Sequence, residues 1–510
     1  MSALLSRPVM FTRRHIGRLT LAMAGVLASA SCDGARTRAA APAASRASAS
    51  AASRASAPVA APAPPDPWQI RFTGAGNAEV TATAVGLDGS VWLAGSFARE
   101  MAARERRWTS PTGDFSLRIW VARLSPGGAL DWLVQLPGNH QGEPHDIALR
   151  RNGSVALAAS FQGTVEAPDG ALRSRGDDAL VALLDRDGRL LWARSGGGDG
   201  HDAARGIDID PGGGLVLVGS FTGRADFGGR RLDSIPGPHV ASRDGFVARY
   251  AAGGGLIRID RFGGSHDDEA QAVAVRGDGS AVVAGHFGGT AAVGELSLTA
   301  RSIGAHAANP ADALVAAFDV DGAVLWASHA GGGPWTFARA IDDYPDGSVV
   351  VAGELIGRAS FGRDATVEVG EPGDRAEAFA ARFESSGELR WATATRGGGR
   401  AWAVSASADA TWIAGDHADG ARFPGGDRLA TGSRHGGFVA RLDRRGALVW
   451  ATPVGRGRAR IAGVAADGHG RVIAVGSAGD PIAAGQEPAE PDDYDGIAVV
   501  LTAAGQAPPR

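Results

Sequence analysis

Three polar segments of the chain carry histidine close to carboxylate, a combination that can hold a divalent metal or transfer protons. The residues concerned are His140, His145 and Asp146, then His201 and Asp202, then His266, Asp267 and Asp268. If these segments met at one site, the chain could be a metal-assisted lyase or hydrolase, with a divalent metal as its cofactor.

A structural role competes with this hypothesis, because the same residue types recur at fixed distances before the turn that follows each segment. His140 aligns with His266, and Asp202 aligns with Asp268. Side chains that recur at one repeat position usually brace their own loop by accepting backbone N–H bonds. The chain also lacks a nucleophile signature, a phosphate-binding loop and a zinc spacing. We therefore assign no catalytic residue and no metal ligand from the sequence, and the balance is against an enzyme.

Short apolar strands in a repeated unit must position these segments. Residues 244–287 form one copy, in which four apolar runs are separated by turns rich in Gly and Asp. Such a pattern predicts a four-stranded antiparallel sheet. Seven copies are present, and their second strands begin at Ser90, Ser154, Gly214, Ser280, Ser348, Thr411 and Arg471. The repeat predicts an all-β fold, a seven-bladed β-propeller with four antiparallel strands in each blade.

The last copy lacks a fourth strand of its own, and the start of the propeller supplies one. The other fourth strands carry, at one position, Trp132, Trp192, Ile259, Trp326, Trp391 and Trp450. Trp68 has the same sequence surroundings. We therefore expect an N-terminal strand with Trp68, Ile70 and Phe72 to complete the last blade, beside the strand that holds Ile497 and Val499. This pairing would close the ring and remove an exposed sheet edge.

The loops that join each fourth strand to the next first strand differ around the ring. The early loops hold the histidines and carboxylates named above, and the later ones hold Trp335, Arg400, Trp402, Arg456, Arg458 and Arg460. The sequence thus predicts an acidic, histidine-containing sector of the loop face opposite a sector rich in Arg and Trp.

The composition excludes several kinds of partner and framework. The 510 residues carry a net charge of −4 and no lysine, so no global basic field would recruit nucleic acid. Cys32 is the only cysteine, which excludes an internal disulfide and a multi-cysteine metal site. Stability must come from burial and strand pairing.

The N-terminus has the pattern of a signal peptide over residues 1–31. Arg13 and Arg14 precede an apolar stretch that is too short to span a bilayer, and they leave twin-arginine and general secretory export both open. Cleavage after Ala30 would release a secreted or periplasmic protein. The alternative, which we favour, is that Ala30-Ser31-Cys32 resembles a lipobox, although Ser29 departs from it, so that Cys32 would carry a lipid anchor.

The remaining boundaries follow from composition. Residues 32–65 are Ala, Ser, Pro and Arg with almost no branched aliphatic residue, so we expect a disordered tether between membrane and ring. The propeller is expected over 66–505, and 506–510 are expected to form a disordered tail.

The order FVARLD, Gly, LxW, GG, DD, IAVD, Gly, VxVAG over residues 66–502 resembles the bacterial seven-bladed propeller repeats (SBBP-type) and the related delta-sixty repeats. This resemblance implies a propeller on an exported bacterial protein, and it implies no activity.

Three functions are compatible with these patterns. The favoured one is an exported, lipid-anchored and monomeric scaffold or recognition module, which binds an envelope protein or glycan without catalysis and without a cofactor. The second is the metal-assisted lyase or hydrolase, and the third is a purely structural envelope protein.

Overall fold

The computed structural model describes residues 67–505, apart from 75–76, 112–114, 238–241, 303–309, 363–366, 430–434, 456–457, 468–469, 480–493 and 503–504. The predicted signal peptide 1–31, lipidation site Cys32, tether 32–65 and tail 506–510 lie outside the described residues, as does Arg456. All described strands belong to one compact unit, Ala63–Arg510. Among the described residues, no helix is long and apolar enough to cross a membrane.

A four-stranded antiparallel sheet is the basic element, and the sheet that comes first in the chain illustrates it. Its strands, in spatial order, are β2 (Ala78–Val85), β3 (Val91–Phe97), β6 (Arg118–Leu124) and β7 (Leu130–Gln135). Every residue of β3 is buried, because neighbouring sheets cover both of its faces. The turn before β3 is closed by Asp88, whose carboxylate accepts the N–H of Ser90 at 3.0 Å, and by Gly89 at φ +75°.

Four further sheets repeat this arrangement with four to six strands each. The next sheet along the chain consists of β8 (His140–Leu149), β9 (Val155–Ala167), β10 (Gly170–Arg173), β11 (Asp178–Leu184) and β12 (Leu190–Gly196). The sheet after it consists of β13 (Ala203–Ile209), β14 (Leu215–Thr222), β17 (Arg243–Tyr250), β18 (Leu256–Gly264), β21 (Thr290–Val293) and β22 (Leu296–Thr299). A third sheet consists of β31 (Gly399–Ala406), β32 (Ala410–Ala418), β33 (His435–Asp443) and β34 (Leu448–Val454). The fourth consists of β35 (Ala459–Ala466), β36 (Val472–Gly479), β37 (Tyr494–Leu501) and β1 (Gln69–Phe72). Separate two-stranded hairpins are formed by β4 (Glu100–Ala103) with β5 (Arg106–Thr109) and by β15 (Arg224–Phe227) with β16 (Arg230–Asp233).

The last sheet has ten strands rather than four. It contains β19 (Glu269–Val275), β20 (Ala281–Gly288), β23 (Ala311–Phe318), β24 (Val324–Gly331), β25 (Trp335–Asp343), β26 (Val349–Ile356), β27 (Ala359–Phe361), β28 (Val367–Val369), β29 (Ala376–Phe383) and β30 (Leu389–Ala394). Its two halves join through one parallel pair, Ala311 with Trp335, and through a two-residue ladder between β24 and β27.

The predicted all-β, propeller-like ring of small sheets is confirmed, but the prediction of seven separate sheets is wrong. Five sheets of four to six strands stand apart, and the ten-stranded sheet is continuous. The physical reason is local, because a few backbone hydrogen bonds beside Ala311 and Gly331 are enough to link two antiparallel runs.

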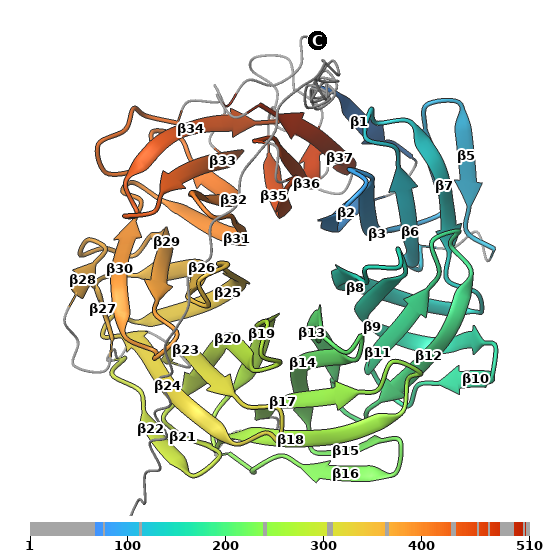
Figure 1. Cartoon of the computed structure of the whole chain (residues 1–510), viewed down its shortest axis with the longest axis horizontal. Helices are drawn as coiled ribbons and strands as arrows, with labels where there is room; N and C mark the ends of the chain where they lie inside the picture. The colour runs from blue at the N-terminus through green and yellow to red at the C-terminus, as the bar shows by residue number, and fades with distance from the viewer. Residues whose placement is uncertain are drawn as a thin grey trace, which may run out of the picture. The chain divides into compact units, whose positions relative to one another are not determined.

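The innermost strands surround the centre of the ring (Figure 1). In cyclic order they are β2, β8, β13, β19, β25, β31 and β35, and each contacts the next, with β35 returning to β2. The first strand of each run therefore lines a central channel, and its side chains determine what that channel can hold.

The two ends of the described chain share one sheet. β1 pairs antiparallel with β37, so that Gln69 lies opposite Val499, Arg71 opposite Ile497 and Phe72 opposite Gly496. Ile70 is 3% exposed and Phe72 is fully buried. The N-terminal strand thus completes the sheet that contains the C-terminal strand.

Apolar layers between neighbouring sheets make up the core. One layer joins the β1 sheet to the β2 sheet, where the rings of Phe72 and Trp120 stack with centroids 4.9 Å apart. Ile497 and Val499 lie in the layer on the other face, together with Val439 of β33. The middle strands of the sheets are therefore buried on both faces, which explains the long apolar runs of the sequence.

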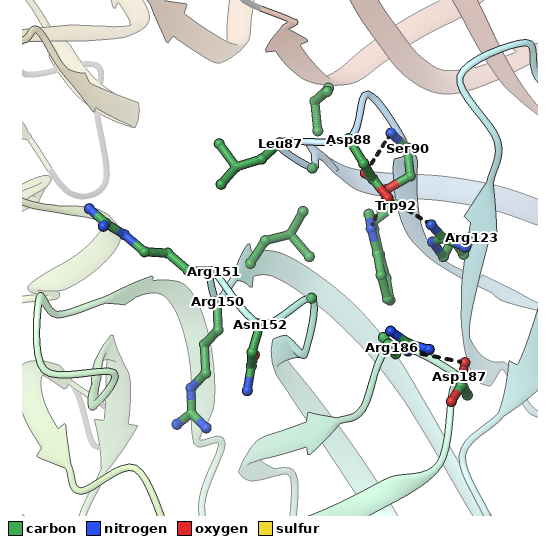
Figure 2. Close-up of a pocket in the computed structure, with 14 residues that line it drawn as sticks. Leu87, Asp88, Ser90, Trp92, Arg123, Arg150, Arg151, Asn152, Arg186 and Asp187 are labelled. Carbon is green, nitrogen blue, oxygen red and sulfur yellow. Dashed lines mark hydrogen bonds and ion pairs between the residues drawn. The ribbon is translucent and has the colours of Figure 1, made fainter.

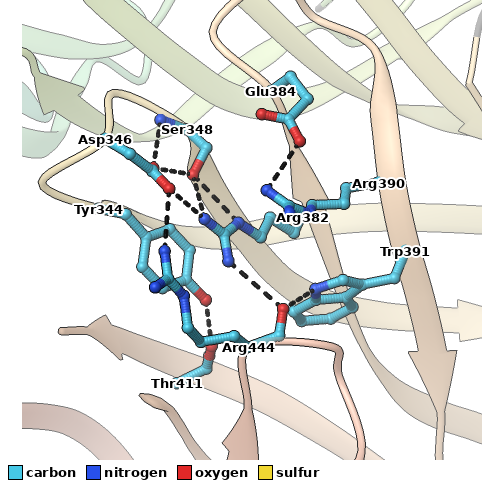
Figure 3. A network of polar contacts seen from close by, with 9 residues as sticks. All are labelled: Tyr344, Asp346, Ser348, Arg382, Glu384, Arg390, Trp391, Thr411 and Arg444. Carbon is cyan, nitrogen blue, oxygen red and sulfur yellow. Dashed lines mark hydrogen bonds and ion pairs between the residues drawn. The ribbon is translucent and has the colours of Figure 1, made fainter. Parts of the chain in front are cut away.

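Buried arginines link the turns of adjacent sheets (Figure 3). The guanidinium of Arg382 in β29 is fully buried, donates to Asp346 Oδ2 at 2.7 Å and to Ser348 Oγ at 2.8 Å, and lies 3.9 Å from the ring centroid of Tyr344. It also donates to the carbonyl of Arg444 in the next sheet at 3.4 Å.

Candidate functional site

Each innermost strand contains one β-bulge, and the bulges lie at equivalent positions. The pairing skips one residue in every case: Thr81, His145, Arg205, Gln271, Arg339, Trp402 and Ala462. The skipped residue of a bulge is left out of the pairing ladder, so its side chain is re-aimed. All seven line one cavity of about 540 Å³. We call these residues the bulge ring.

A second tier of side chains lies just before the bulges, on the side away from the turns that end the innermost strands. Glu79 of β2 pairs with Ser96, and Glu269 of β19 pairs with His286. The residues of this tier that line the same cavity are Glu79, Ser96, Glu143, Glu269, His286, Phe337, Arg460 and Ser477. We call the bulge ring together with this tier the mouth of the channel.

Some charged groups of the mouth are paired with each other. Arg243 of β17 forms an ion pair with Glu269. Arg339 Nη2 lies 2.6 Å from Glu354 Oε1, and Arg400 Nε lies 2.8 Å from the other oxygen of Glu354. Burial works to raise the pKa of Glu269, but the net shift is downward, and the guanidiniums of Arg243, Arg205 and Arg339 contribute to it. These ion pairs hold Arg243, Arg339 and Arg400 in place.

Two guanidiniums of the mouth have no carboxylate partner among the described residues. Arg205 reaches only the ring of His145, at 3.3 and 3.4 Å, and its buried Nε makes no hydrogen bond. Arg460 lies 4.0 Å from the ring centroid of Trp402. Such stacking fixes the plane of a guanidinium and leaves its N–H edge free for an oxyanion.

Two carboxylates of the mouth, Glu79 and Glu143, also have no ion-pair or hydrogen-bond partner among the described side chains. Burial raises the pKa of Glu79, Arg460 works against that rise, and Glu143 adds to it. The mouth therefore offers unpaired groups of both signs.

Two neutral histidines complete the mouth. Burial lowers the pKa of His286 to about 4, although Glu269 opposes that shift. Burial and the charge of Arg205 hold the pKa of His145 well below its ordinary value, and its Nε2 lies 3.0 Å from Ser160 Oγ. Both rings are thus uncharged near pH 7 and add hydrogen-bonding groups without adding charge.

Three carboxylates deeper in the channel link neighbouring innermost strands. Asp146 accepts the N–H of Ile207 at 3.0 Å, Asp208 accepts that of Val275 at 2.6 Å, and Asp342 accepts that of Ala406 at 2.7 Å. Burial raises the pKa of each of the three to about 7. Their bonds to the next strand indicate a structural role.

The structure places the predicted metal candidates in different surroundings. His145 belongs to the mouth and Asp146 to the channel below it. His140 is 2% exposed, neither of its ring nitrogens has a hydrogen-bond partner, and burial lowers its pKa to about 4. His201 is exposed, with Nδ1 2.5 Å from Asp177 Oδ2, and His266 has Nδ1 3.3 Å from Ser265 Oγ.

The remaining candidates bond to their own loops. Asp202 accepts the N–H groups of Gly198 and Thr222, at 2.7 and 3.0 Å. Asp268 accepts those of Gly264 and Gly288, at 2.6 and 3.1 Å, and Asp267 accepts that of Arg243 at 3.1 Å. In the part of the chain that the structure describes, no three His, Cys, Asp or Glu residues are grouped to hold a metal ion.

The predicted separation of an acidic sector from an Arg/Trp sector is wrong. Arg205 and Arg243 lie in the part expected to be acidic, and Glu354 and Asp416 accompany Arg400 in the other part. The sequence could not show this, because Glu354, Asp416 and Arg243 come from second and third strands rather than from the loops.

Sequence reasoning also missed Arg205, Gln271 and Arg339 as site residues. One signal lies beside them in the second strands. The residue that follows a Gly, or Ala159 in the second copy, varies from strand to strand: Ser96, Ser160, Ser220, His286, Glu354, Asp416 and Ser477. A position that varies within an otherwise uniform strand is not required for the packing of the sheets, and its side chain is available for binding.

A second cavity, of about 840 Å³, lies among the turns at the other end of the strands (Figure 2). One of its arginines is engaged locally, since Arg123 pairs with Asp88 and with Asp131 at 2.9 Å each. Among the described residues, Arg150 donates only to the carbonyl of Ala252 at 3.0 Å. Arg151 is exposed at its edge. This cavity is larger than the mouth but holds fewer unpaired groups.

Comparison with known proteins leaves the family open. No family model matches the chain, so the SBBP-type resemblance stays a prediction. No curated protein sequence matches it. Similar solved structures include hydrazine synthase from Kuenenia stuttgartiensis, with 12% identity, coverage of 78% of this chain and 92% of that chain, and a TM-score of 0.43. They also include an apocarotenoid oxygenase from Synechocystis, with 10% identity, coverage of 76% and 94%, and a TM-score of 0.31. Likenesses at this level carry no argument about ligand or reaction.

Proposed function

We propose that the protein is a non-catalytic binding module, a propeller of seven blades that binds its ligand at the mouth of the channel. The ten-stranded sheet counts as two of these blades, because β19, β20, β23 and β24 pair in antiparallel order, as do β25, β26, β29 and β30.

The observation that carries the proposal is the bulge ring. Equivalent positions elsewhere in the repeat keep one residue type, as the turn glycines Gly89, Gly153 and Gly279 do. The bulge positions instead hold hydroxyl, imidazole, guanidinium, amide and indole groups, and all of them face one cavity. A repeated framework that presents different groups at one place is suited to recognition of one asymmetric ligand.

The location of the module is part of the proposal. The chain would be exported through its signal peptide, residues 1–31, anchored by a lipid at Cys32 and held off the membrane by the tether 32–65. There it would act as a monomer, bind a protein or glycan component of the envelope, and use neither nucleic acid nor a cofactor.

Binding to the mouth can be tested with the exported chain carrying Cys32→Ser, to keep it unlipidated. Soluble peptide and glycan fractions from envelope extract are titrated against this protein, and ligand binding is followed by the shift in thermal unfolding temperature. The variants are Arg460→Ala and Trp402→Ala in the mouth, with Arg151→Ala beside the turn cavity as the matched control.

We expect at least one fraction to stabilise the parent and the Arg151→Ala protein but neither mouth variant. Stabilisation that survives in both mouth variants and is lost in Arg151→Ala would overturn the assignment of the site. A chelator should leave the shift unchanged. Loss of the shift with chelator would instead support the metal-assisted lyase or hydrolase.

A further inference from the structure

The unpaired charges of the mouth are confined to one half of the ring. They are Arg460 of β35, Glu79 of β2, Glu143 of β8 and Arg205 of β13, and these four strands are consecutive around the channel. The other charged residues that line the mouth, Arg243, Glu269 and Arg339, belong to ion pairs. A ligand in the cavity would therefore find the unpaired charged side chains on that half of the ring.

The four groups follow an order of sign along this half. Because β35, β2, β8 and β13 are consecutive, Arg460 neighbours Glu79, Glu79 neighbours Glu143, and Glu143 neighbours Arg205. Arg205 also interacts with Glu269, which is already paired with Arg243. The sequence of charges is positive, negative, negative, positive. The two glutamates are thus neighbours, and a guanidinium stands at each end.

Ligands of a single charge fit this order poorly. A dianion would be attracted by Arg460 or Arg205 but repelled by Glu79 and Glu143. A polyamine would be attracted by the two glutamates but repelled by the two arginines. A neutral sugar would remove four ionic groups from water without pairing them, which is costly. Only a ligand that carries both signs satisfies the groups that the fold leaves unpaired.

We propose that the mouth binds a small zwitterion, an amino acid or short peptide with a free amine and a free carboxylate. The amine lies between Glu79 and Glu143, and the carboxylate receives N–H bonds from Arg205 or from Arg460. Both arginines are held for this purpose, Arg205 by His145 and Arg460 by the indole of Trp402. The cavity of about 540 Å³ has room for two or three residues. This inference rests on the mouth being the ligand site.

The test uses three matched probes, dialanine, N-acetyl-dialanine and dialanine amide, each titrated calorimetrically into the unlipidated exported chain. Dialanine should bind, and each blocked probe should bind about ten-fold more weakly or worse, because each loses one charge-assisted contact. The double variant Glu79→Gln, Glu143→Gln should lose the preference for the free amine but keep the preference for the free carboxylate. The double variant Arg205→Gln, Arg460→Gln should show the opposite pattern.

The control is Arg151→Gln, which should bind all three probes as the parent does. Because Arg205 is partly buried, unfolding of each unliganded variant is measured as well, and Arg460→Gln alone replaces the double variant if that variant is unfolded. Equal binding of free and blocked dialanine, or no binding at millimolar probe, would overturn the zwitterion assignment. If the envelope fraction still stabilised the parent and not Arg460→Ala, the mouth would remain the site and only the ligand class would be wrong.

Discussion

The indole of Trp68 lies against Gly128, so closely that a Cβ on Gly128 would sit 2.4 Å from Cδ2 of Trp68. Trp68 immediately precedes β1, which completes the last sheet, and Gly128 lies in the turn between β6 and β7 of the first. The indole Nε1 also donates to the carbonyl of Pro126 at 3.0 Å. The same packing recurs around the ring, at Trp132 with Gly188, Trp192 with Gly254, Trp326 with Gly387, Trp391 with Gly446 and Trp450 with Gly505. This contact is the joint between successive blades.

The contact between Trp68 and Gly128 predicts that adding one methyl group at Gly128 lowers the free energy of unfolding. Gly128→Ala places a Cβ inside the Trp68 ring and forces a non-glycine residue to φ +79°, so we expect a loss of about 2–4 kcal/mol in the free energy of unfolding. Gly213→Ala is the matched control, because Gly213 has φ +80° but open space where its Cβ would lie. That variant should lose only about 1 kcal/mol. Equal losses in urea unfolding would show that backbone strain, and not the tryptophan contact, determines the cost.

Removal of the indole should weaken the seam where the ring closes. Trp68 is 8% exposed, and Trp68→Ala should lower the free energy of unfolding by about 3–5 kcal/mol, since the cavity it leaves lies between two sheets. Limited proteolysis should then cut first near residues 67–74. Leu87→Ala, at a residue 92% exposed, should change neither property. First cleavage elsewhere in the ring would contradict the role of the seam.

The buried guanidinium of Arg382 predicts a second stability difference. Arg382→Met removes the buried guanidinium that donates to Asp346 and Ser348, and we expect a loss of about 2–4 kcal/mol in the free energy of unfolding. The carbonyl of Arg444 keeps the indole N–H of Trp391 as a donor, at 3.0 Å. Arg441 occupies the same repeat position on β33 but is 23% exposed and pairs with an exposed Asp409 at 3.2 Å. Arg441→Met should therefore lose less than about 1 kcal/mol. Similar losses from the two variants in thermal unfolding would mean that burial of the guanidinium contributes little.

Features that recur in every copy could be predicted from the sequence. The turns at Gly89 and Gly279, the tryptophan position and the pairing partner of the N-terminal strand all follow from aligning the copies. Each of these features depends on contacts within one copy or between adjacent copies. The same residue types therefore recur at the same position in each copy and reveal the feature. The ten-stranded sheet could not be predicted, because it depends on the approach of Ala311, the first residue of β23, to Trp335, the first residue of β25, and neither copy alone shows that approach.

The site could be predicted only in part. His145, a metal candidate in the sequence, lines the mouth, and so does Arg205, which follows the loop residue Asp202 by three positions and which the sequence did not single out. A bulge shifts the register by one residue, and the local sequence contains no signature for it, because Ala-Arg-Gly and Ala-Gln-Ala fit a regular strand equally well. Which side chain faces the channel is therefore a property of pairing, and pairing became visible only in the structure.

The carboxylates of the channel predict how stability depends on pH. The pKa of Asp208 is raised by burial to about 7 in the folded chain, against about 3.9 when unfolded. Between these values the folded chain holds a proton that the unfolded chain has released, so the stabilisation is complete below about pH 4 and is lost as the pH rises through 7. Asp208→Asn removes this dependence. Its stability relative to the parent should rise by about 1–3 kcal/mol from pH 4 to pH 8, less than the full conversion of the shift because the side chain keeps some contact with water.

A histidine provides the control of opposite sign. The pKa of His140 is lowered by burial to about 4, so the unfolded chain takes up its proton first, and the parent gains stability between about pH 4 and pH 6.5. His140→Leu removes that gain, and its stability relative to the parent should fall over the same range. Urea unfolding of the parent and both variants at six pH values separates the two effects. Differences that stay constant with pH would show that both side chains titrate normally in the folded chain.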